Sequence, residues 1–202
     1  MTAFDAASKL AQFRQILTAQ SLDGFYLTRA DRFQGEEVRA GDEYLAYLTG
    51  FTGSAGVGLI LQETAALFTD GRYQLQITQQ TDNCLYQTFD SADKNLNQWM
   101  AEQPVKGKLV LGYDSWAVTV SGLDSLPKKC GAAEIDWIAC DQNLLNQIWS
   151  GRPAYTNAET FVLDEAVAGK TAYAKQAEAM DGLHTADCRL CLITAPDCVN
   201  WL

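Results

Sequence analysis

The chain has 202 residues, a formal net charge of −10 and 48% hydrophobic residues, which is the composition of a folded globular protein. Its acidic balance argues against nucleic acid and anionic membranes as partners, because both need basic surface. No apolar run approaches the length of a membrane span, and residues 1–5 do not resemble a secretory signal. We therefore expect a cytoplasmic protein with no membrane or nucleic-acid partner.

The first predicted element is an amphipathic helix, because Leu10, Phe13 and Leu17 recur at helical spacing. Strands and helices then alternate along the chain. Strands are predicted at 25–28, 57–61, 65–69, 85–89, 108–112 and 134–140, and helices at 42–49, 72–81, 92–102, 115–126 and 144–149. This alternation predicts an α/β fold, whose sheet is mixed because 57–61 and 65–69 form a hairpin.

Residues 151–157 have the composition of a linker, with Pro153 at their centre. Beyond them the pattern predicts a helix at 170–180, a strand at 187–194 and a helix starting at Pro196. About one βαβ unit is too small to bury a core alone. We therefore expect a complete domain at 1–150, a linker at 151–157, and at 158–202 the truncated start of a second, similar domain.

Two cysteines, Cys188 and Cys191, have the spacing of a zinc or redox motif. On the predicted strand at 187–194, however, side chains three residues apart point to opposite faces, so these thiols would not converge on one ion. The sequence holds no second pair of this kind. We therefore interpret both residues as thiols buried in a core, where free cysteine behaves as a small hydrophobe.

Two glycine motifs suggest nucleotide binding, but their context does not support it. Gly53, Gly56 and Gly58 reverse the order of the dinucleotide fingerprint and precede a predicted hairpin instead of a helix. Lys170 and Thr171 resemble the end of a phosphate-binding loop, yet the first glycine of that motif is replaced by Asp164. We interpret the first motif as a structural turn and the second as a helix start.

The single histidine, His184, cannot form a multi-histidine zinc site. It follows Gly182, which we expect to end the preceding helix, and it suits a position at the surface near that helix end.

The sequence GFTGSAG occupies residues 50–56, and the sequence TDGRY occupies residues 69–73. This pair of motifs, with the polar loop at 29–45 before it, resembles the N-terminal domain of the Xaa-Pro aminopeptidases. They are the three-domain branch of the creatinase and prolidase superfamily. A weaker likeness continues to residue 202. The resemblance implies a creatinase N-terminal-type mixed sheet flanked by helices, a homodimer, and a parent enzyme that releases the residue preceding proline from short peptides.

The resemblance also implies binding roles, not bond-breaking ones, for two residues. The acidic residue matching Glu36 and the arginine matching Arg72 approach the substrate in this family. A glutamate there receives the substrate ammonium, and an arginine fixes peptide carbonyls or a carboxylate. Residues alone leave other interpretations open: solvated charge for Glu36, and an ion pair with Asp70 for Arg72. Phe33 stands where the family has histidine, and Glu37 replaces an aromatic residue, so the loop's substrate contacts are open to question.

In this family hydrolysis takes place in a C-terminal pita-bread domain that holds two divalent metals, usually manganese, through two Asp, one His and two Glu. The resemblance places these ligands outside the present sequence, so we expect no catalytic residue, no metal and no peptidase activity here. Two alternatives remain open at this stage. One is a stand-alone interaction or dimerisation module, and the other is part of a creatinase-like amidinohydrolase.

Overall fold

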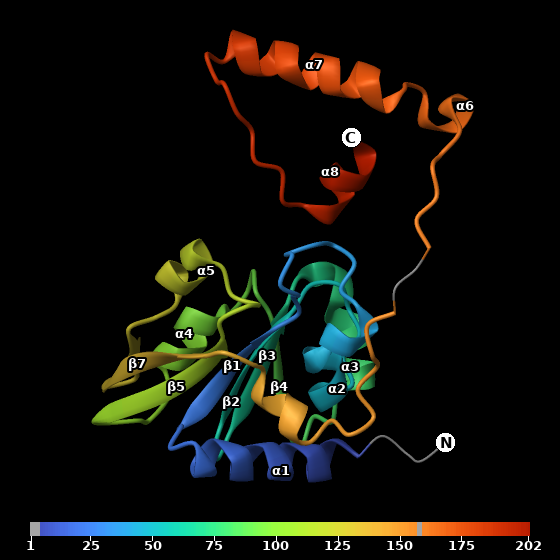
Figure 1. Ribbon diagram of the computed structural model, residues 1–202. Helices are drawn as coiled ribbons and strands as arrows, with labels where there is room; N and C mark the ends of the chain where they lie inside the picture. Colours follow the sequence, from blue (N-terminus) through green and yellow to red (C-terminus); the bar gives the residue numbers. More distant parts are fainter. Residues whose placement is uncertain (1–4, 157–158) are drawn as a thin grey trace.

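The computed structural model describes residues 5–156 and 159–202, and a seven-stranded sheet forms its centre (Figure 1). The strand order is β4-β3-β2-β1-β5-β7-β6. The strands are β1 (Gly24–Thr28), β2 (Val57–Leu61), β3 (Ala65–Thr69), β4 (Gln87–Asp90), β5 (Lys108–Asp114), β6 (Lys129–Cys130) and β7 (Ala133–Cys140).

Helices precede, separate and follow the strands. The α-helices are α1 (Ala6–Ala19), α2 (Tyr44–Thr49), α3 (Gln74–Gln80), α4 (Leu96–Ala101), α5 (Val120–Ser125), α6 (Glu165–Ala168), α7 (Ala172–Thr185) and α8 (Pro196–Trp201). Short 3₁₀ helices are η1 (Ala40–Asp42), η2 (Gly71–Tyr73) and η3 (Leu144–Gln147). None of the described helices combines the length and the apolar content that crossing a bilayer demands.

The sheet is mixed, as the sequence predicts. β1 pairs antiparallel with β2 and parallel with β5, and β5 pairs parallel with β7. The predicted hairpin is confirmed: β2 and β3 pair antiparallel, with Val57 opposite Phe68. The carboxyl ends of β1, β5 and β7 therefore lie at one edge of the sheet, where the connecting loops gather polar side chains.

Each face of the sheet carries its own hydrophobic cluster. On β2, Ile60 belongs to one cluster, while Leu59 and Leu61 belong to the other, as the two-residue period of a strand requires. The first cluster includes residues of α1 and α2, and the second includes residues of α4. Helices thus cover both faces, which confirms the predicted α/β class.

Several boundaries differ from the sequence prediction. The helix predicted at 115–126 starts only at Val120, because the Thr119 hydroxyl accepts from Gly122 N and caps it there. The helix predicted at 72–81 begins instead as the 3₁₀ turn η2, since Asp70 accepts from Arg72 N. The short strand β6 was not predicted, because two residues are too few for a periodic signal.

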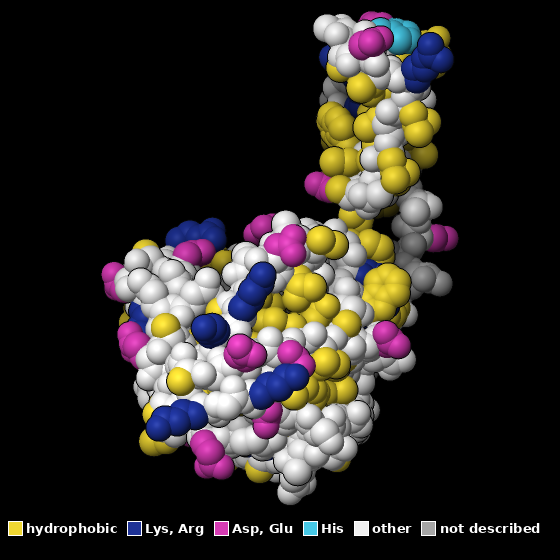
Figure 2. Space-filling view, turned by 90° about the vertical axis from the view of Figure 1, so that its left-hand side faces the viewer, with side chains coloured by type: hydrophobic (Ala, Val, Ile, Leu, Met, Phe, Trp, Pro, Cys, Tyr) yellow, Lys and Arg dark blue, Asp and Glu magenta, His cyan; other side chains and the backbone are white. Residues whose placement is uncertain are grey.

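Residues 159–202 hold helices α6, α7 and α8 (Figure 1). The prediction of a strand at 187–194 is wrong: this segment has no strand, because no neighbouring strand offers hydrogen bonds to it. Cys188 and Cys191 are exposed, which corrects their interpretation as buried thiols. Many apolar side chains of this segment are also exposed, as Figure 2 shows on the part that projects at its top.

Helix α7 also corrects a boundary. It continues past Gly182 to Thr185, so Gly182 does not end it, and the exposed His184 lies in its last turn. The predicted helix start at Lys170 and Thr171 is confirmed, because the Thr171 hydroxyl accepts from Ala174 N and caps α7. The glycine-lysine-threonine motif therefore serves as a helix cap in this structure.

Candidate functional site

The two sequence motifs, the turn at 50–56 and the segment at 69–73, lie against each other. Gly50 ends α2 with a φ of 85°, which glycine adopts without strain. A Cβ on Gly53 would lie 2.3 Å from the Phe51 ring and 2.9 Å from the Tyr73 ring. Glycine is needed there because these aromatic rings fill the space beside the turn.

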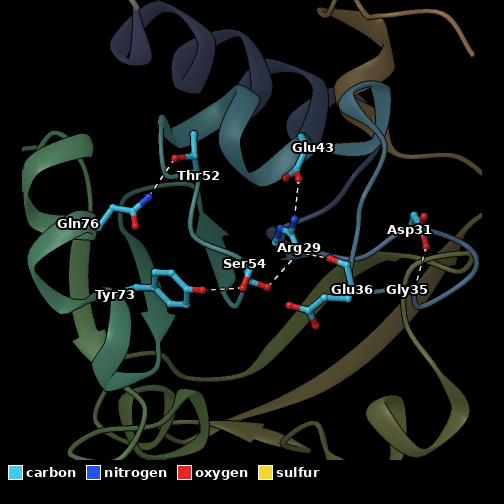
Figure 3. A network of polar contacts seen from close by, with 9 residues as sticks. All are labelled: Arg29, Asp31, Gly35, Glu36, Glu43, Thr52, Ser54, Tyr73 and Gln76. Atoms are coloured by element: carbon cyan, nitrogen blue, oxygen red, sulfur yellow. Dashed lines mark hydrogen bonds and ion pairs between the residues drawn. The ribbon is translucent and has the colours of Figure 1, made fainter. Parts of the chain in front are cut away.

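Hydrogen bonds fix the turn to the second motif. The Thr69 hydroxyl donates to the carbonyl oxygen of Ala55 at 2.6 Å. The hydroxyls of Ser54 and Tyr73 are 2.6 Å apart, as Figure 3 shows. On the other side, Gln76 Nε2 donates to the Thr52 hydroxyl at 3.0 Å. These contacts explain why the two motifs occur together in the sequence: each supplies the hydrogen-bond partners of the other.

Arg29 joins three segments at the centre of this network (Figure 3). Its side chain is 10% exposed, and its Nη1 donates to the carbonyl oxygens of Glu36 and Ser54, both at 3.0 Å. Its Nη2 forms an ion pair with Glu43 at 3.0 Å. Burial raises the pKa of Glu43, and the charge of Arg29 opposes that rise. Arg29 thus positions the Glu36 loop relative to the turn at 50–56.

Arg72 is largely exposed, with 68% of its side chain accessible, and it forms a two-pronged ion pair with Asp70. Its Nε and Nη2 donate to the two carboxylate oxygens at 3.0 and 2.7 Å. The hydrogen bond with Arg72 lowers the pKa of Asp70. The ion pair that residues alone left open is therefore present. The Arg72 guanidinium therefore faces solvent, and the Asp70 carboxylate balances part of its charge.

Glu36 lies within electrostatic reach of Arg72. The hydrogen bond and charge of Asp70 raise the pKa of Arg72 most, and the negative charge of Glu36 adds to that rise. Glu36 is exposed, and within residues 5–156 and 159–202 its carboxylate accepts no hydrogen bond. The fold therefore leaves these two oppositely charged residues near enough for their charges to interact, without a direct contact between them among the described residues.

The two departures from the family pattern lie on the same loop. Phe33 is partly exposed, and the Arg39 guanidinium lies 5.2 Å from the centre of its ring. Glu37 is exposed. A phenyl ring offers no proton, so any hydrogen bond that an imidazole would make at this position is lost.

Sequence reasoning missed Arg29, although one signal was available. A charged residue directly after the apolar strand at 25–28 either turns outward or needs buried partners. Its partners are the carbonyl oxygens of Glu36 and Ser54 and the carboxylate of Glu43, which lie 7, 25 and 14 residues away in sequence, so their meeting depends on the fold. The same holds for the hydroxyl pair of Ser54 and Tyr73.

Throughout the described part of the chain, no group of three or more His, Cys, Asp or Glu side chains is arranged to hold a metal ion. The residues described here therefore do not fit a metal centre.

A family profile described as the creatinase/prolidase N-terminal domain matches residues 9–147. The chain belongs to this family. A probable Xaa-Pro aminopeptidase P of Pyrenophora teres is 34% identical over 84% of the chain and 26% of its own length. A probable Xaa-Pro aminopeptidase P of Talaromyces marneffei is 30% identical over 100% of the chain and 31% of its own length. The chain thus spans about a quarter to a third of these relatives.

Among solved structures, an X-prolyl aminopeptidase of Caenorhabditis elegans matches with a TM-score of 0.81 at 25% identity. The match covers 98% of this chain and 34% of that one, which is described as a cytosolic enzyme with a di-nuclear active site. An Xaa-Pro dipeptidase of Bacillus anthracis matches in fold, with a TM-score of 0.51 over 71% of this chain. The likeness to the C. elegans enzyme therefore extends beyond residue 147, where the family profile ends.

Proposed function

We propose that this chain is the N-terminal, non-catalytic region of a metal-dependent Xaa-Pro aminopeptidase, in which Glu36 and Arg72 bind the substrate. The parent would release an N-terminal residue that precedes proline. Its di-nuclear manganese centre would be held by another part of the protein. The observation that supports this most is the match over 98% of the chain to an X-prolyl aminopeptidase. The placement of Glu36 within reach of Arg72 agrees with it.

The chemistry of the two residues suits a peptide. The carboxylate of Glu36 is exposed and accepts no hydrogen bond within the described residues, so it is available to a substrate ammonium. Arg72 already binds Asp70 with its Nε and Nη2, so a peptide carbonyl would meet the remaining N–H groups of its guanidinium. Both roles orient a substrate, and neither residue breaks a bond.

The test compares the natural protein that contains these residues with its variants on an Xaa-Pro tripeptide in the presence of Mn²⁺. Loss of one exposed charged contact typically costs about 1 kcal/mol or more of binding. We expect Glu36→Gln and Arg72→Met each to raise KM about fivefold or more, with a smaller change in kcat. Asp93→Asn, an exposed carboxylate outside this site, serves as the matched control.

Unchanged KM values in both variants would remove the proposed binding roles. The wider proposal has its own test, which uses the 202-residue chain alone. With Mn²⁺ added, it should give no turnover of the tripeptide. Cleavage that follows the chain through purification would show that the catalytic centre lies within it and would contradict the proposal.

The same proposal includes a domain at 1–150, a linker at 151–157, a partial second domain at 158–202, a cytoplasmic location and a homodimer.

The exposed apolar side chains of 159–202 support a surface that a partner covers, since monomeric proteins rarely leave such patches uncovered. Light scattering on the natural protein would test the dimer, and a monomer at micromolar concentration would exclude it.

A further inference from the structure

A second candidate site lies beside the Glu36 loop, at the carboxyl ends of three parallel strands. The loops after β1, β5 and β7 surround a cavity of about 340 Å³. After β1 the chain continues to β2 on one side of the sheet, and after β5 it continues towards β6 and β7 on the other side. The connections after these two adjacent strands therefore diverge. Crevices at this position of α/β sheets are common ligand sites, and the volume suits a small molecule.

Some charged groups of the cavity wall already have partners. Arg152 forms an ion pair with Asp42 at 2.9 Å and donates from Nε to the carbonyl oxygen of Gly41 at 2.6 Å. The Tyr155 hydroxyl lies 2.8 Å from one Asp42 oxygen and 3.0 Å from the other. Asp114 accepts from Trp116 N at 2.9 Å. These groups build the wall and need no ligand.

Several groups of the wall remain open, among them Asp31, Arg32 and Trp116. Asp31 is only 4% exposed, and its Oδ1 accepts from Phe33 N and Gly35 N, but its Oδ2 has no partner among the residues that the structure describes. Arg32 lies 5.2 Å from the centre of the Trp116 ring, and it has no ion pair or hydrogen bond within the same residues. Trp116 is 59% exposed.

The open groups are held in place before any ligand binds. Gln34 Nε2 donates to the carbonyl oxygens of Asp31 and Ala117, at 3.0 and 3.1 Å. This amide therefore ties the loop that carries Asp31 and Arg32 to the loop that carries Trp116. A wall that is already ordered loses little conformational entropy on binding.

We propose that this cavity binds a small zwitterion of amino-acid or dipeptide size. The Asp31 carboxylate accepts the ligand's ammonium group, Arg32 binds its carboxylate, and the Trp116 ring packs against an apolar side chain. Each contact uses a group that the fold leaves open: a carboxylate oxygen without a hydrogen bond on the mostly buried Asp31, a guanidinium without an ion pair, and a largely exposed indole ring. The inference stands on the cavity alone and holds whether or not the chain serves an aminopeptidase.

The test titrates the 202-residue chain with L-phenylalanine and with glycyl-L-phenylalanine, followed by calorimetry and by NMR of the Trp116 indole N–H. We expect at least one of them to bind saturably, with a dissociation constant on the order of 1 mM. N-acetyl-L-phenylalanine lacks the ammonium group and L-phenylalaninamide lacks the carboxylate. Each should bind about tenfold more weakly or not at all.

Variants locate the site. Asp31→Asn keeps an oxygen for Phe33 N and Gly35 N, and Arg32→Gln changes an exposed side chain, so both should fold, which circular dichroism checks. Both should weaken binding about tenfold. Their controls are Asp93→Asn and Arg189→Gln, exposed residues outside the cavity, which should bind as the unchanged chain does.

Three results would each overturn the proposal. One is no saturable binding of either zwitterion. Another is equal binding of the amide, which would mean that an acidic cavity simply attracts cations. The third is binding that survives both Asp31→Asn and Arg32→Gln, which would place the ligand elsewhere on the chain.

Discussion

Single residues hold the candidate site together, and Arg29 contributes most. Replacing it by methionine leaves the Glu43 carboxylate and two carbonyl oxygens without their donor. We expect Arg29→Met to lower the free energy of unfolding by about 2–4 kcal/mol, because the Arg29 side chain is only 10% exposed and its three acceptors lose their donor. Urea unfolding measures this loss.

A variant of Glu43, the ion-pair partner of Arg29, serves as the control. Glu43→Gln keeps an acceptor for Arg29, so it should cost only about 1 kcal/mol. The double variant Arg29→Met/Glu43→Gln should cost less than the sum of the single changes, since the stranded carboxylate is gone. Strict additivity of the two single changes would show that the ion pair adds nothing to stability.

Asp114 gives a pH-dependent prediction. Burial raises the pKa of its carboxyl above the ordinary value of 3.8, and the nearby charge of Asp42 adds to the rise. A raised pKa means that the folded state binds the proton more tightly, so the contribution of Asp114 to stability falls as the pH rises above 3.8. Asp114→Asn removes this dependence and keeps an oxygen for Trp116 N.

The test compares how the free energy of unfolding depends on pH in Asp114→Asn and in the unchanged chain. As the pH rises above the ordinary value of 3.8, the free energy of unfolding of Asp114→Asn should rise relative to that of the unchanged chain. Thermal or urea unfolding at a series of pH values measures it. A difference that stays constant, or that moves in the opposite direction, would mean that burial does not raise this pKa.

At the residue scale, the resemblance named Glu36 and Arg72, whose binding roles stay predictions, and sequence reasoning did not find the side chain that positions the Glu36 loop. Glu36 and Arg72 do lie within electrostatic reach of each other. The contacts of Arg29 escaped prediction because two of its acceptors are backbone carbonyl oxygens, which every residue has, and the third, the Glu43 carboxylate, meets it only in the folded chain. The open Oδ2 of Asp31 could not be inferred either, since it depends on which oxygen the loop's N–H groups use.

At the scale of elements, local signals succeeded where they are strong. The β2–β3 hairpin has the predicted bounds because two apolar runs flank a short polar turn. The strand predicted at 187–194 failed for the opposite reason. Apolar residues favour a strand only when a neighbouring strand completes the ladder, and this segment has none.

Two loop glycines, Gly107 and Gly131, have positive φ angles and lead to a prediction about stability. Gly131 has a φ of 56° and Gly107 a φ of 87°, so alanine is unfavourable at both. A Cβ on Gly131 would also lie 2.0 Å from the carbonyl oxygen of Gln103, whereas nothing lies within 4 Å of one on Gly107. We expect Gly107→Ala to cost about 1 kcal/mol and Gly131→Ala about 3 kcal/mol or more, measured by urea unfolding.

The pair of variants separates two effects. Backbone strain is shared, so the difference between them reports the clash between the loop before β7 and the end of α4. Equal losses would show that the loop moves freely and that Gly131 serves only its backbone conformation.

At the scale of the whole molecule, the two parts of the chain differ in how they bury apolar residues. Residues 5–156 hold both hydrophobic clusters. Residues 159–202 leave Val162 97% exposed, and none of their three helices holds a buried residue. Segments with few buried contacts open at little free-energy cost, so they should be cut first by a protease.

Limited trypsin digestion with mass spectrometry measures this difference. We expect cleavage after Lys175 and Arg189 well before cleavage within residues 5–155, because α7 holds no buried residue and Arg189 is exposed. The remaining fragment should keep the thermal midpoint of the intact chain to within a few degrees, since both clusters stay whole. Early cuts within 5–155 would contradict the assignment of stability to that part.

The natural protein then provides the comparison. If residues 159–202 pack against a further part of a longer aminopeptidase, as we propose, their apolar side chains become buried there and the bonds after Lys175 and Arg189 become protected. The expected change is a slowing of cleavage by about tenfold or more, because each 1.4 kcal/mol of added local stability lowers the open population tenfold. Equal cleavage rates in the chain and in the natural protein would argue against a completed second domain and for an independent role of this segment.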